Sequence, residues 1–312
     1  VYFTSDYMSY VHNLVIAIVG PTAVGKSNLA VDLALKHQGE IISADSRQIY
    51  RGLDIGTAKP PDHHLVAVRH HLIDLVDPDE PYSLALYLLH ARRAISDVLQ
   101  RQKLPILVGG SGQYIWGLLE GWQVPEVPPS PEIRERLETR AKREGGEALY
   151  RELVGIDPVS AKRLDPRNLR RVVRALELHY AFGDIPSPNR KEIPPFKPTI
   201  IGLHLERQDL YQTIDTRVDT MIAAGWVDEV RGLIDEGYSL DLPSMSSLGY
   251  QELGNYLNGI IELPEAIRSI KNKTHRFARQ QYAWFKKDDS RISWFNASAL
   301  EETRDFVTQI VG

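Results

Sequence analysis

Two kinds of hydrophobic pattern alternate along the chain. Short apolar runs at residues 14–19, 104–108 and 199–205 have the length and composition of buried strands. Over residues 83–101, and again over 209–224 and 227–236, apolar side chains recur at the three- and four-residue spacing of a helix. Strands that alternate with helices predict an α/β fold, in which helices flank a parallel sheet.

Proline-rich segments at residues 125–131 and 185–198 interrupt this pattern. Between them the chain is charged and helical in pattern up to about residue 182, and Ser130 followed by Pro131 is a typical helix start. Strand character returns at residue 199. The sequence therefore predicts a tail of residues 1–13, a catalytic core of residues 14–125 and 196–312, and an all-helical insertion domain of residues 126–195.

The first apolar run leads into a glycine-rich turn that reads G-x-x-x-x-G-K-S and opens a helix. Strand, turn and helix in this order are the setting of the phosphate loop of P-loop NTPase-like folds. Backbone N–H groups of the turn and the helix N-terminus favour an anion at one spot, the lysine adds a mobile charge, and the Ser27 hydroxyl can hold Mg²⁺. We expect a diphosphate or a triphosphate to bind to Gly20, Pro21, Thr22, Ala23, Val24, Gly25, Lys26 and Ser27.

A second short strand, at residues 40–45, ends in a carboxylate. Ligands of open α/β sheets lie outside the carboxyl ends of the strands, so Asp45 is expected beside the phosphate loop. The alternative is that Asp45 caps a helix. The strand at 104–108 runs into Gly109-Gly110-Ser111-Gly112 and lacks the acidic residue that holds Mg²⁺ in nucleoside triphosphatases, which argues against ATP hydrolysis.

Composition limits the possible chemistry. The 312 residues include no cysteine, which excludes disulfides, thiolate catalysis and cysteine-held zinc and fits a reducing, cytoplasmic setting. The net charge of −4 argues against a basic coat over the whole surface. No apolar run reaches membrane-spanning length. The neighbours His70 and His71 point to opposite faces of a strand, which favours packing or substrate contact over a shared metal.

Basic residues are nevertheless concentrated in two helical segments. Arg167, Arg170, Arg171 and Arg174 share one helix face without an acid, and they form either a solvated face or a phosphate-binding surface. The segment 263–287 is strongly basic, with Glu265 as its only acid, and it is the best nucleic-acid signal in the chain. The aromatic residues interleaved with this segment are expected in the core: Phe277, Tyr282, Trp284 and Phe285.

Taken together, these segments resemble the tRNA dimethylallyltransferases, also called tRNA isopentenyltransferases. The resemblance covers nearly everything from residue 14 to about residue 294. Its most specific part runs from DSRQ to GTAKP, which P-loop kinases lack. The matching stretches are GPTAVGKS at 20–27, ISADSRQIYRGLDIGTAKP at 42–60, HHLID at 70–74, DPDEPYS at 77–83, PILVGGSGQY at 105–114, RRVVRALE at 170–177, LGYQE at 248–252 and HRFARQQYAWFKK at 275–287.

The resemblance implies transfer of a prenyl group from dimethylallyl diphosphate to the exocyclic amine of the adenosine 3′ to the anticodon of tRNA, with Mg²⁺ as cofactor. It implies that Asp45 accepts a proton from the amine, that Ser111 meets the bridging oxygen of the diphosphate, and that Arg217 helps to bind the diphosphate. The insertion domain is implied to close on the anticodon stem-loop of a tRNA bound by a monomer. The tRNA contacts are expected from Asp45, Ser46, Arg47, Gln48, Arg170, Arg174, Gly249, Tyr250, Arg276 and Arg279.

The chain departs from the family pattern at three positions. Thr213 stands where the family usually has arginine, one turn before Arg217. Gln280 and Ala283 stand where arginine and threonine are usual. None of these changes touches the phosphate loop, Asp45 or Ser111.

Three other classes of protein share some of these features. A P-loop kinase would bind ATP on the same loop, so consumption of ATP would distinguish it from a prenyltransferase. An adenylate isopentenyltransferase would prenylate free AMP, which needs neither the basic helices nor a closing insert. An RNA-binding protein without activity would not need the phosphate loop, Asp45 and Ser111 together.

Overall fold

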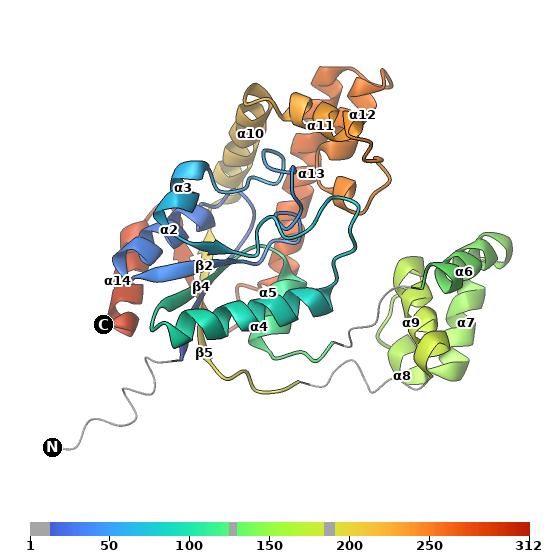
Figure 1. Cartoon of the computed structure of the whole chain (residues 1–312), viewed down its shortest axis with the longest axis horizontal. Helices are drawn as coiled ribbons and strands as arrows, with labels where there is room; N and C mark the ends of the chain where they lie inside the picture. The colour runs from blue at the N-terminus through green and yellow to red at the C-terminus, as the bar shows by residue number, and fades with distance from the viewer. Residues whose placement is uncertain (1–12, 125–129, 184–190) are drawn as a thin grey trace. The chain divides into compact units, whose positions relative to one another are not determined.

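A six-stranded parallel sheet forms the centre of the larger part of the chain (Figure 1). The structure is a computed structural model, and it describes residues 13–124, 130–183 and 191–312. The strand order is β3-β2-β4-β1-β5-β6. The strands are β1 (Leu14–Val19), β2 (Gly39–Ser43), β3 (His70–His71), β4 (Leu104–Val108), β5 (Lys197–His204) and β6 (Ile292–Asn296).

Helices cover both faces of this sheet, which is why its central strands are apolar along their whole length. All of β1 and all of β4 are buried. Alternate residues of β1, such as Ile16 and Ile18, pack in one cluster with Leu29 and Leu33. The helices of this unit are α2 (Lys26–Lys36), α3 (Asp62–Ala67), α4 (Leu84–Gln100), α5 (Gly112–Leu119), α10 (Arg207–Ala223), α11 (Trp226–Asp235), α12 (Tyr250–Leu257), α13 (Leu263–Trp284) and α14 (Leu300–Val311), with a 3₁₀ turn η1 (Ser244–Ser246).

Residues 122–192 form a second compact unit, separate from the unit of residues 1–121 and 193–312. Its helices are α6 (Pro131–Glu144), α7 (Gly146–Ile156), α8 (Pro158–Ala161) and α9 (Leu169–Phe182). They enclose their own apolar cluster, which includes Leu137, Leu149, Leu153 and Leu176. The two ends of the unit meet where Trp122 and Lys191 pair in an antiparallel bridge.

The predicted α/β fold is confirmed. The strands at 14–19 and 104–108 have the predicted bounds, and Ser130 caps α6 with Pro131 in its first turn. The second predicted strand is shorter than expected, because β2 ends at Ser43 and leaves Asp45 in the following loop. The proline-rich breaks lie partly outside the described residues.

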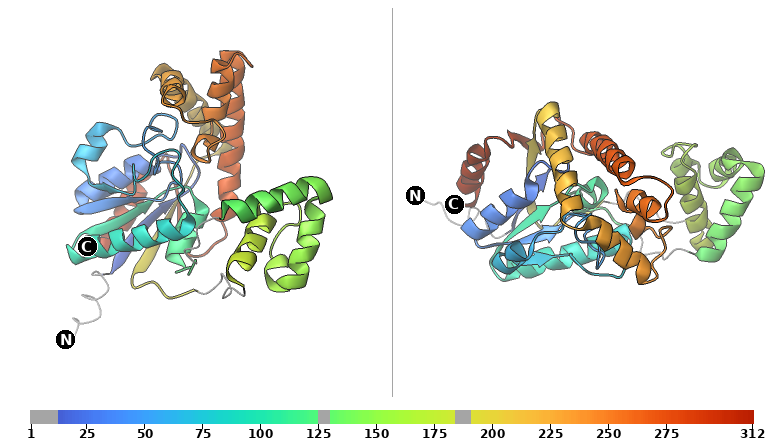
Figure 2. Two further views of the ribbon diagram at one scale, coloured as in Figure 1. Left: turned by 45° about the vertical axis from the view of Figure 1, so that its right-hand side comes forward. Right: turned by 90° about the horizontal axis from the view of Figure 1, so that it is seen from above.

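Helices α10 and α13 pack side by side (Figure 2). Tyr211 of α10 stacks on His275 of α13 with ring centroids 4.1 Å apart. Farther along α10, Asp219 accepts a hydrogen bond from Lys271 at 2.8 Å. Residues 211 and 219 therefore face 275 and 271, so the two helices run antiparallel.

Within the described residues, no helix combines the length and the apolar character that crossing a membrane requires.

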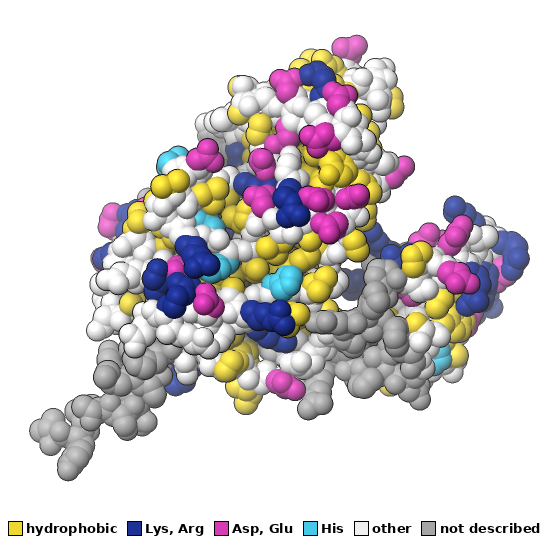
Figure 3. All heavy atoms as spheres, in the orientation of Figure 1, with side chains coloured by type: hydrophobic (Ala, Val, Ile, Leu, Met, Phe, Trp, Pro, Cys, Tyr) yellow, Lys and Arg dark blue, Asp and Glu magenta, His cyan; other side chains and the backbone are white. Residues whose placement is uncertain are grey.

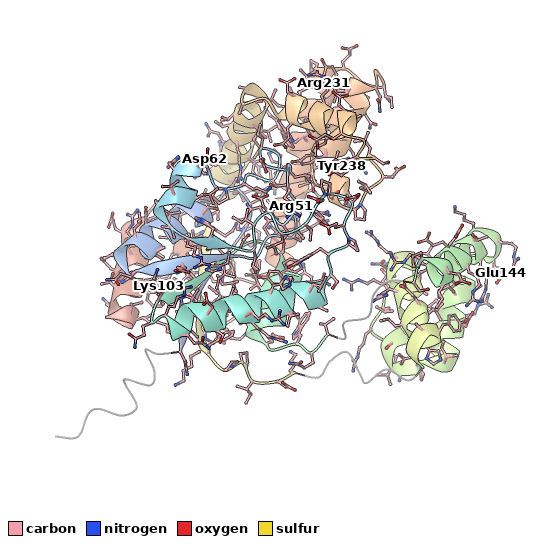
Figure 4. The ribbon with its side chains drawn as sticks, viewed as in Figure 1. Arg51, Asp62, Lys103, Glu144, Arg231 and Tyr238 are labelled. Atoms are coloured by element: carbon pink, nitrogen blue, oxygen red, sulfur yellow. The ribbon has the colours of Figure 1, made fainter. Side chains whose placement is uncertain are left out.

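Glu40 of β2 is a buried carboxylate surrounded by cations. It is 1% exposed, and it accepts hydrogen bonds from Arg101 (2.7 Å) and from Lys103 (2.8 Å) and contacts His71 Nε2 at 2.8 Å. Lys103 directly precedes β4 (Figure 4). The guanidinium of Arg101, helped by Lys103 and His71, holds the pKa of the Glu40 carboxyl well below its usual range despite burial. The expectation of a packing role is confirmed for His71.

Replacing this carboxylate should destabilise the core. Glu40→Gln should lower the free energy of unfolding by about 2 kcal/mol, because hydrogen bonds to a charged group are lost while a polar group stays buried. Since the folded pKa is depressed, the difference between the two proteins should be constant above about pH 5 and should narrow as the pH falls further. Urea unfolding of both proteins across this pH range measures the difference in their free energies of unfolding.

A matched control is Glu301→Gln, because Glu301 is 82% exposed and pairs with Arg304 at the surface. That change should alter the free energy of unfolding by less than about 0.5 kcal/mol. An equal effect of both substitutions would contradict a stabilising role for the Glu40 cluster.

Candidate active site

The phosphate loop connects β1 to α2 in the predicted way. Gly20 has φ +136°, and a Cβ there would lie 2.4 Å from the carbonyl oxygen of Leu203. Gly25 is left-handed, with φ 92°, and precedes the first turn of α2. The first backbone N–H groups of α2 have no partner within the helix, so the loop and the helix start offer several donors to an anion.

Lys26 lies in the pocket with its ammonium bonded to the loop itself, at 2.6 Å from the carbonyl oxygen of Pro21. Burial of the ammonium is the main cause that lowers the pKa of Lys26 to about 7. The charge of Arg217 lowers it further, whereas Asp45 raises it. Burial also lowers the pKa of Arg217, and again Asp45 opposes the shift. Two half-buried cations and one carboxylate thus leave a site that favours an anionic ligand.

Ser27 was expected to hold Mg²⁺. It follows Lys26 at the start of α2, lines the same pocket and is exposed. Its hydroxyl makes no side-chain hydrogen bond within the part of the chain that is described. No group of three or more metal-ligating His, Asp or Glu side chains occurs among those residues either. Mg²⁺ commonly keeps several waters and binds through ligand phosphates with one or two protein oxygens, so this residue set fits the ion.

Three loops meet at the carboxyl edge of the sheet because β2, β4 and β1 are neighbours. The backbone N–H of Ala44, after β2, donates to Val108 at the end of β4. A Cβ at Gly109 would lie 2.1 Å from the carbonyl oxygen of Ala44, so only glycine fits there. Ser111 Oγ accepts a hydrogen bond from the backbone N–H of Ser46 at 3.0 Å. The loop that carries Ser111 is therefore locked to the loop that carries Asp45.

Asp45 caps a turn rather than a helix. Its Oδ1 accepts the backbone N–H of Arg47 at 2.8 Å, and the residues that follow do not continue into a helix. The helix-cap alternative is therefore wrong, and the expected position beside the phosphate loop is confirmed. One carboxylate oxygen is held by the turn.

Two adjoining cavities, of about 400 and 480 Å³, meet at these loops. The first contains the phosphate loop with Lys26 and Ser27. The second contains Ser46, Arg47 and Ser111, and its wall is more apolar, with Tyr114, Met221 and Leu248. The residues that line both cavities are Thr22, Ala23, Asp45, Thr57, Ala58, Gly110, Arg217, Phe277 and Gln281. A phosphate-bearing ligand in the first cavity and another reactant in the second would meet at this shared wall.

Two aromatic residues of α13 line the second cavity, contrary to expectation. Phe277 and Trp284 are each 38% exposed, and Phe277 lines the first cavity as well. The expectation of a core position is confirmed for Phe285, which is fully buried. It is wrong for Phe277 and Trp284, because the helix turns their side chains toward the cavity.

Gln48 does not offer its side chain to a second reactant. Its Oε1 accepts from Ser43 Oγ at 3.0 Å, and its Nε2 donates to the carbonyl oxygens of Thr57 and Ala58 at 3.3 and 3.1 Å. It lines the first cavity and is not among the residues of the second. In this structure the Gln48 amide supports the loop around Thr57, and the expected tRNA contact of Gln48 stays a prediction.

Arg47 ties its loop to η1. Its guanidinium donates to the carbonyl oxygen of Pro243 at 2.5 Å and to Ser246 Oγ at 3.1 Å. Arg47 also lines the second cavity, as do Ser246, Ser247 and Leu248. Arg51, in the same loop, is held by Asp77 at 2.7 Å and by the carbonyl oxygen of Asp74 (Figure 4).

Neither Tyr250 nor Gly249 reaches the surface. The expected tRNA contact is therefore wrong for both residues. Tyr250 is fully buried, and its hydroxyl donates to Glu229 at 2.7 Å. A Cβ at Gly249 would lie 2.1 Å from the ring of Trp226. Of the LGYQE stretch, Leu248 lines the second cavity, together with the preceding Ser247.

Glu229 of α11 was not found by sequence reasoning. Its carboxylate accepts the backbone N–H groups of Asp54, Ile55 and Gly56 at 2.9, 2.6 and 3.2 Å, as well as the Tyr250 hydroxyl. It therefore anchors the loop between β2 and α3 from a position about 175 residues away. Four acidic residues cluster within the sequence neighbourhood of α11, and nothing local distinguishes this one.

The basic residues of α13 differ in their partners. Arg279 donates to Tyr211 Oη at 2.5 Å and lies over the same ring. Arg276 is exposed and has no acidic partner within the described ranges. Figure 3 shows Lys, Arg, Asp and Glu side chains interspersed on the visible face, as expected from the negative net charge.

The predicted basic face of α9 contains an acid after all. Arg174 pairs with the buried Glu177 at 2.9 Å, and Arg134 pairs with the same carboxylate. Glu177 lies three residues after Arg174, so it belongs to that face. Arg170 and Arg171 are exposed, whereas Arg167 pairs with Asp165. Arg174 thus helps to hold the second unit together.

This fold and site define a P-loop α/β protein in which the loop after β4 presents glycines, and not an acidic residue, to the phosphate pocket. Comparison with known proteins is consistent with this class. A family model described as IPP transferase matches residues 48–288, and one described as isopentenyl transferase matches residues 13–76. The chain belongs to the IPP transferase family, as the motifs predicted.

Close relatives are tRNA dimethylallyltransferases. The chain is 53% identical to the enzyme of Roseiflexus castenholzii, in an alignment that covers 87% of this chain and 89% of the relative. It is 52% identical to the enzyme of Chloroflexus aurantiacus, in an alignment that covers 89% of this chain and 95% of the relative. Among solved structures it is similar to a tRNA isopentenylpyrophosphate transferase of Bacillus halodurans (37% identity, TM-score 0.70, covering 96% of this chain and 97% of the other). It is also similar to a eukaryotic dimethylallyltransferase acting on tRNA (29%, TM-score 0.80, covering 95% and 80%).

The lowered pKa of Lys26 predicts proton uptake when an anion binds. Free Lys26 is largely neutral at pH 8, because its pKa is about 7, and a bound diphosphate favours the charged form. Wild-type protein should therefore take up about one more proton per diphosphate bound than Lys26→Arg, whose side chain stays charged. Calorimetry of inorganic diphosphate binding at pH 8, in buffers of different ionisation enthalpy, measures the uptake. Equal uptake by both proteins would refute this prediction.

Proposed function

We propose that this protein transfers the dimethylallyl group of dimethylallyl diphosphate to the N6 amine of the adenosine 3′ to the anticodon in tRNA. The observation that carries the proposal is the shared wall of the two cavities, where Asp45 lies between the phosphate loop and the loop of Ser111. Membership of the IPP transferase family supports the same reaction.

The first cavity suits the donor. The loop amides, Lys26 and Arg217 bind the diphosphate, and Ser27 would help to hold Mg²⁺, which supplies further charge neutralisation when bound. During transfer the amine lone pair forms a bond to C1 of the prenyl group, and the C1–O bond breaks with its electron pair going to the diphosphate. The fixed cations stabilise the charge that develops there.

The second cavity suits the acceptor base. An adenine must leave its stack to reach Asp45, and Phe277, Trp284 and Leu248 offer apolar surface for it. The lone pair of the N6 amine is delocalised into the purine, so loss of a proton must accompany bond formation. The carboxylate of Asp45 accepts that proton. Its turn with Arg47 holds one oxygen and leaves the carboxylate oriented.

Ser111 serves the leaving group. The backbone N–H of Ser46 donates to Ser111 Oγ, and the Ser111 hydroxyl itself donates only a long hydrogen bond, of 3.4 Å, to Ser46 Oγ. The hydroxyl proton can therefore turn to the bridging oxygen of the diphosphate. A single donor placed where charge develops stabilises the transition state more than the ground state.

The exposed arginines of α13 and α9 provide surfaces for the tRNA backbone. We assign phosphate contacts to Arg276 and Arg279 in the larger unit and to Arg170 in the second unit, which would close on the anticodon stem-loop. Because tRNA is a cytoplasmic substrate, we place the reaction there, carried out by a monomer.

The transfer assay distinguishes this function from its rivals. With radiolabelled dimethylallyl diphosphate, the protein should prenylate an unmodified anticodon stem-loop far faster than free AMP. Consumption of ATP instead would indicate a kinase, and preference for AMP would indicate an adenylate isopentenyltransferase. Binding of the stem-loop without any transfer would leave only an RNA-binding role.

Substitutions of Asp45 and of Ser111 should slow the transfer for different reasons. Asp45→Asn should slow single-turnover transfer by about 10²–10⁴-fold, because shape is kept but the base is lost. Ser111→Ala should cost about 10–10³-fold, and Ser111→Thr should be nearly silent. A donor with a better leaving group than diphosphate should rescue Ser111→Ala and do little for Asp45→Asn. Equal rescue of both variants would contradict the two roles.

The arginines of α13 should set the salt dependence of tRNA binding. In the double variant that carries Arg276→Gln and Arg279→Gln, the slope of log tRNA affinity against log salt concentration should become shallower. The change should be about 0.7–0.9 for each phosphate contact that is lost. The matched control is Arg231→Gln with Arg304→Gln, because both of these arginines are paired with acids. Equal slopes for wild type and both double variants would mean that Arg276 and Arg279 make no contact with tRNA phosphates.

A further inference from the structure

One buried side chain joins the two glycine loops of the site. Gln281 of α13 is 3% exposed. Its Oε1 accepts the backbone N–H of Thr22 in the phosphate loop at 2.7 Å, and its Nε2 donates to the carbonyl oxygen of Gly110 at 3.1 Å. The amide therefore bridges the loop after β1 and the loop after β4.

The fit between this amide and the loops is tight. A Cβ at position 110 would lie 2.1 Å from Gln281 Nε2 and 3.8 Å from the carbonyl oxygen of Gly20. The space between the two loops is thus filled by the amide, and Gly110 must be glycine to admit it. Ala23, next to Thr22, has a positive φ of 64°, a conformation that needs support from its surroundings.

Other hydrogen bonds do not replace this bridge. The backbone N–H of Gly109 donates to Ile18 at 3.3 Å, which joins the strands below the loops. Across the described residues, Gln281 is the side chain that bonds to both Thr22 and Gly110. Thr22, Gly110 and Gln281 also line both cavities, so the bridge stands at the point where donor and acceptor would meet.

We infer that Gln281 is a positioning residue for the transfer step, which sets the separation between the phosphate loop and the hydroxyl of Ser111. The inference rests on the proposed function. Thr22 belongs to the loop that holds the diphosphate, and Ser111 directly follows Gly110. With both ends of the amide bonded, the leaving-group oxygen and its donor keep one relative position. Without the amide, each loop relaxes separately.

Two substitutions separate this role from simple packing. Gln281→Leu keeps the volume and removes both hydrogen bonds. Gln281→Glu keeps an acceptor for Thr22, but it regains a donor for the Gly110 carbonyl only when the carboxyl group is protonated. A protonated glutamic acid therefore reproduces both bonds of the amide. The matched control is Gln100→Leu, at an exposed residue of α4 that bonds to Ser96.

Single-turnover prenylation of the stem-loop should fall about 10²-fold in Gln281→Leu, since small displacements at a reacting centre cost about that much. The Kd for the donor should rise by less than about tenfold, because only one of the two lost hydrogen bonds reaches the phosphate loop and a neutral hydrogen bond has a modest net effect. The single-turnover rate of Gln281→Glu, relative to wild type at the same pH, should rise as the pH falls. Gln100→Leu should behave as wild type.

Some results would overturn the inference. These are a rate for Gln281→Leu within threefold of wild type, a loss that lies entirely in the donor Kd, or a flat pH profile for Gln281→Glu relative to wild type. The pH profile remains decisive if Gln281→Leu does not fold. Failure of the proposed function is distinct, because wild-type protein would then not prenylate the stem-loop at all.

Discussion

Close backbone contact among three loops is the constraint on which the site depends. Gly109 lies so near the carbonyl of Ala44 that any side chain would clash, and Gly110 lies equally near the amide of Gln281. These contacts bring the ends of β2, β4 and β1 together at one edge of the sheet. Asp45 and Thr22 of the phosphate loop then line both cavities, and Ser111 lies beside them in the second cavity.

The charged groups make the two sides of the wall that the cavities share electrostatically different. Lys26 and Arg217 are half-buried in the first cavity, and desolvation of their charged groups lowers the pKa of both. Asp45 is the nearby carboxylate, and its charge favours the protonated form of each cation. An anionic ligand removes the cost of burying these charges, whereas a neutral ligand leaves it in place. These charges suit the proposed function, in which a diphosphate lies on one side and the proton acceptor on the other.

Local sequence signals predicted much of this arrangement. The phosphate loop, the strand before it and the glycines after β4 are recognisable because turn chemistry and apolar runs are local properties. The position of Asp45 followed from a general rule about strand ends in α/β sheets. The resemblance to a known family added the roles of Asp45 and Ser111, which remain predictions for this chain.

Long-range contacts could not be predicted from a single sequence. Gln281 and Glu229 each bond to backbone groups more than 170 residues away, and nothing beside them in the sequence indicates those partners. Tyr250 was expected to contact tRNA, but its side chain is buried and its hydroxyl donates to the carboxylate of Glu229. Arg174 was expected on a helix face without an acid, but it pairs with Glu177, three residues later. In each case tertiary packing decided what a local pattern left open.

The stereochemistry of transfer tests the central claim most directly. If the diphosphate lies in the first cavity and the amine attacks from the second, C1 of the donor is approached from the side opposite its leaving group. Prenylation of the stem-loop with dimethylallyl diphosphate that carries one deuterium of known configuration at C1, followed by analysis of the product, reports the outcome. The account predicts inversion at C1. Retention would contradict direct transfer between the two cavities.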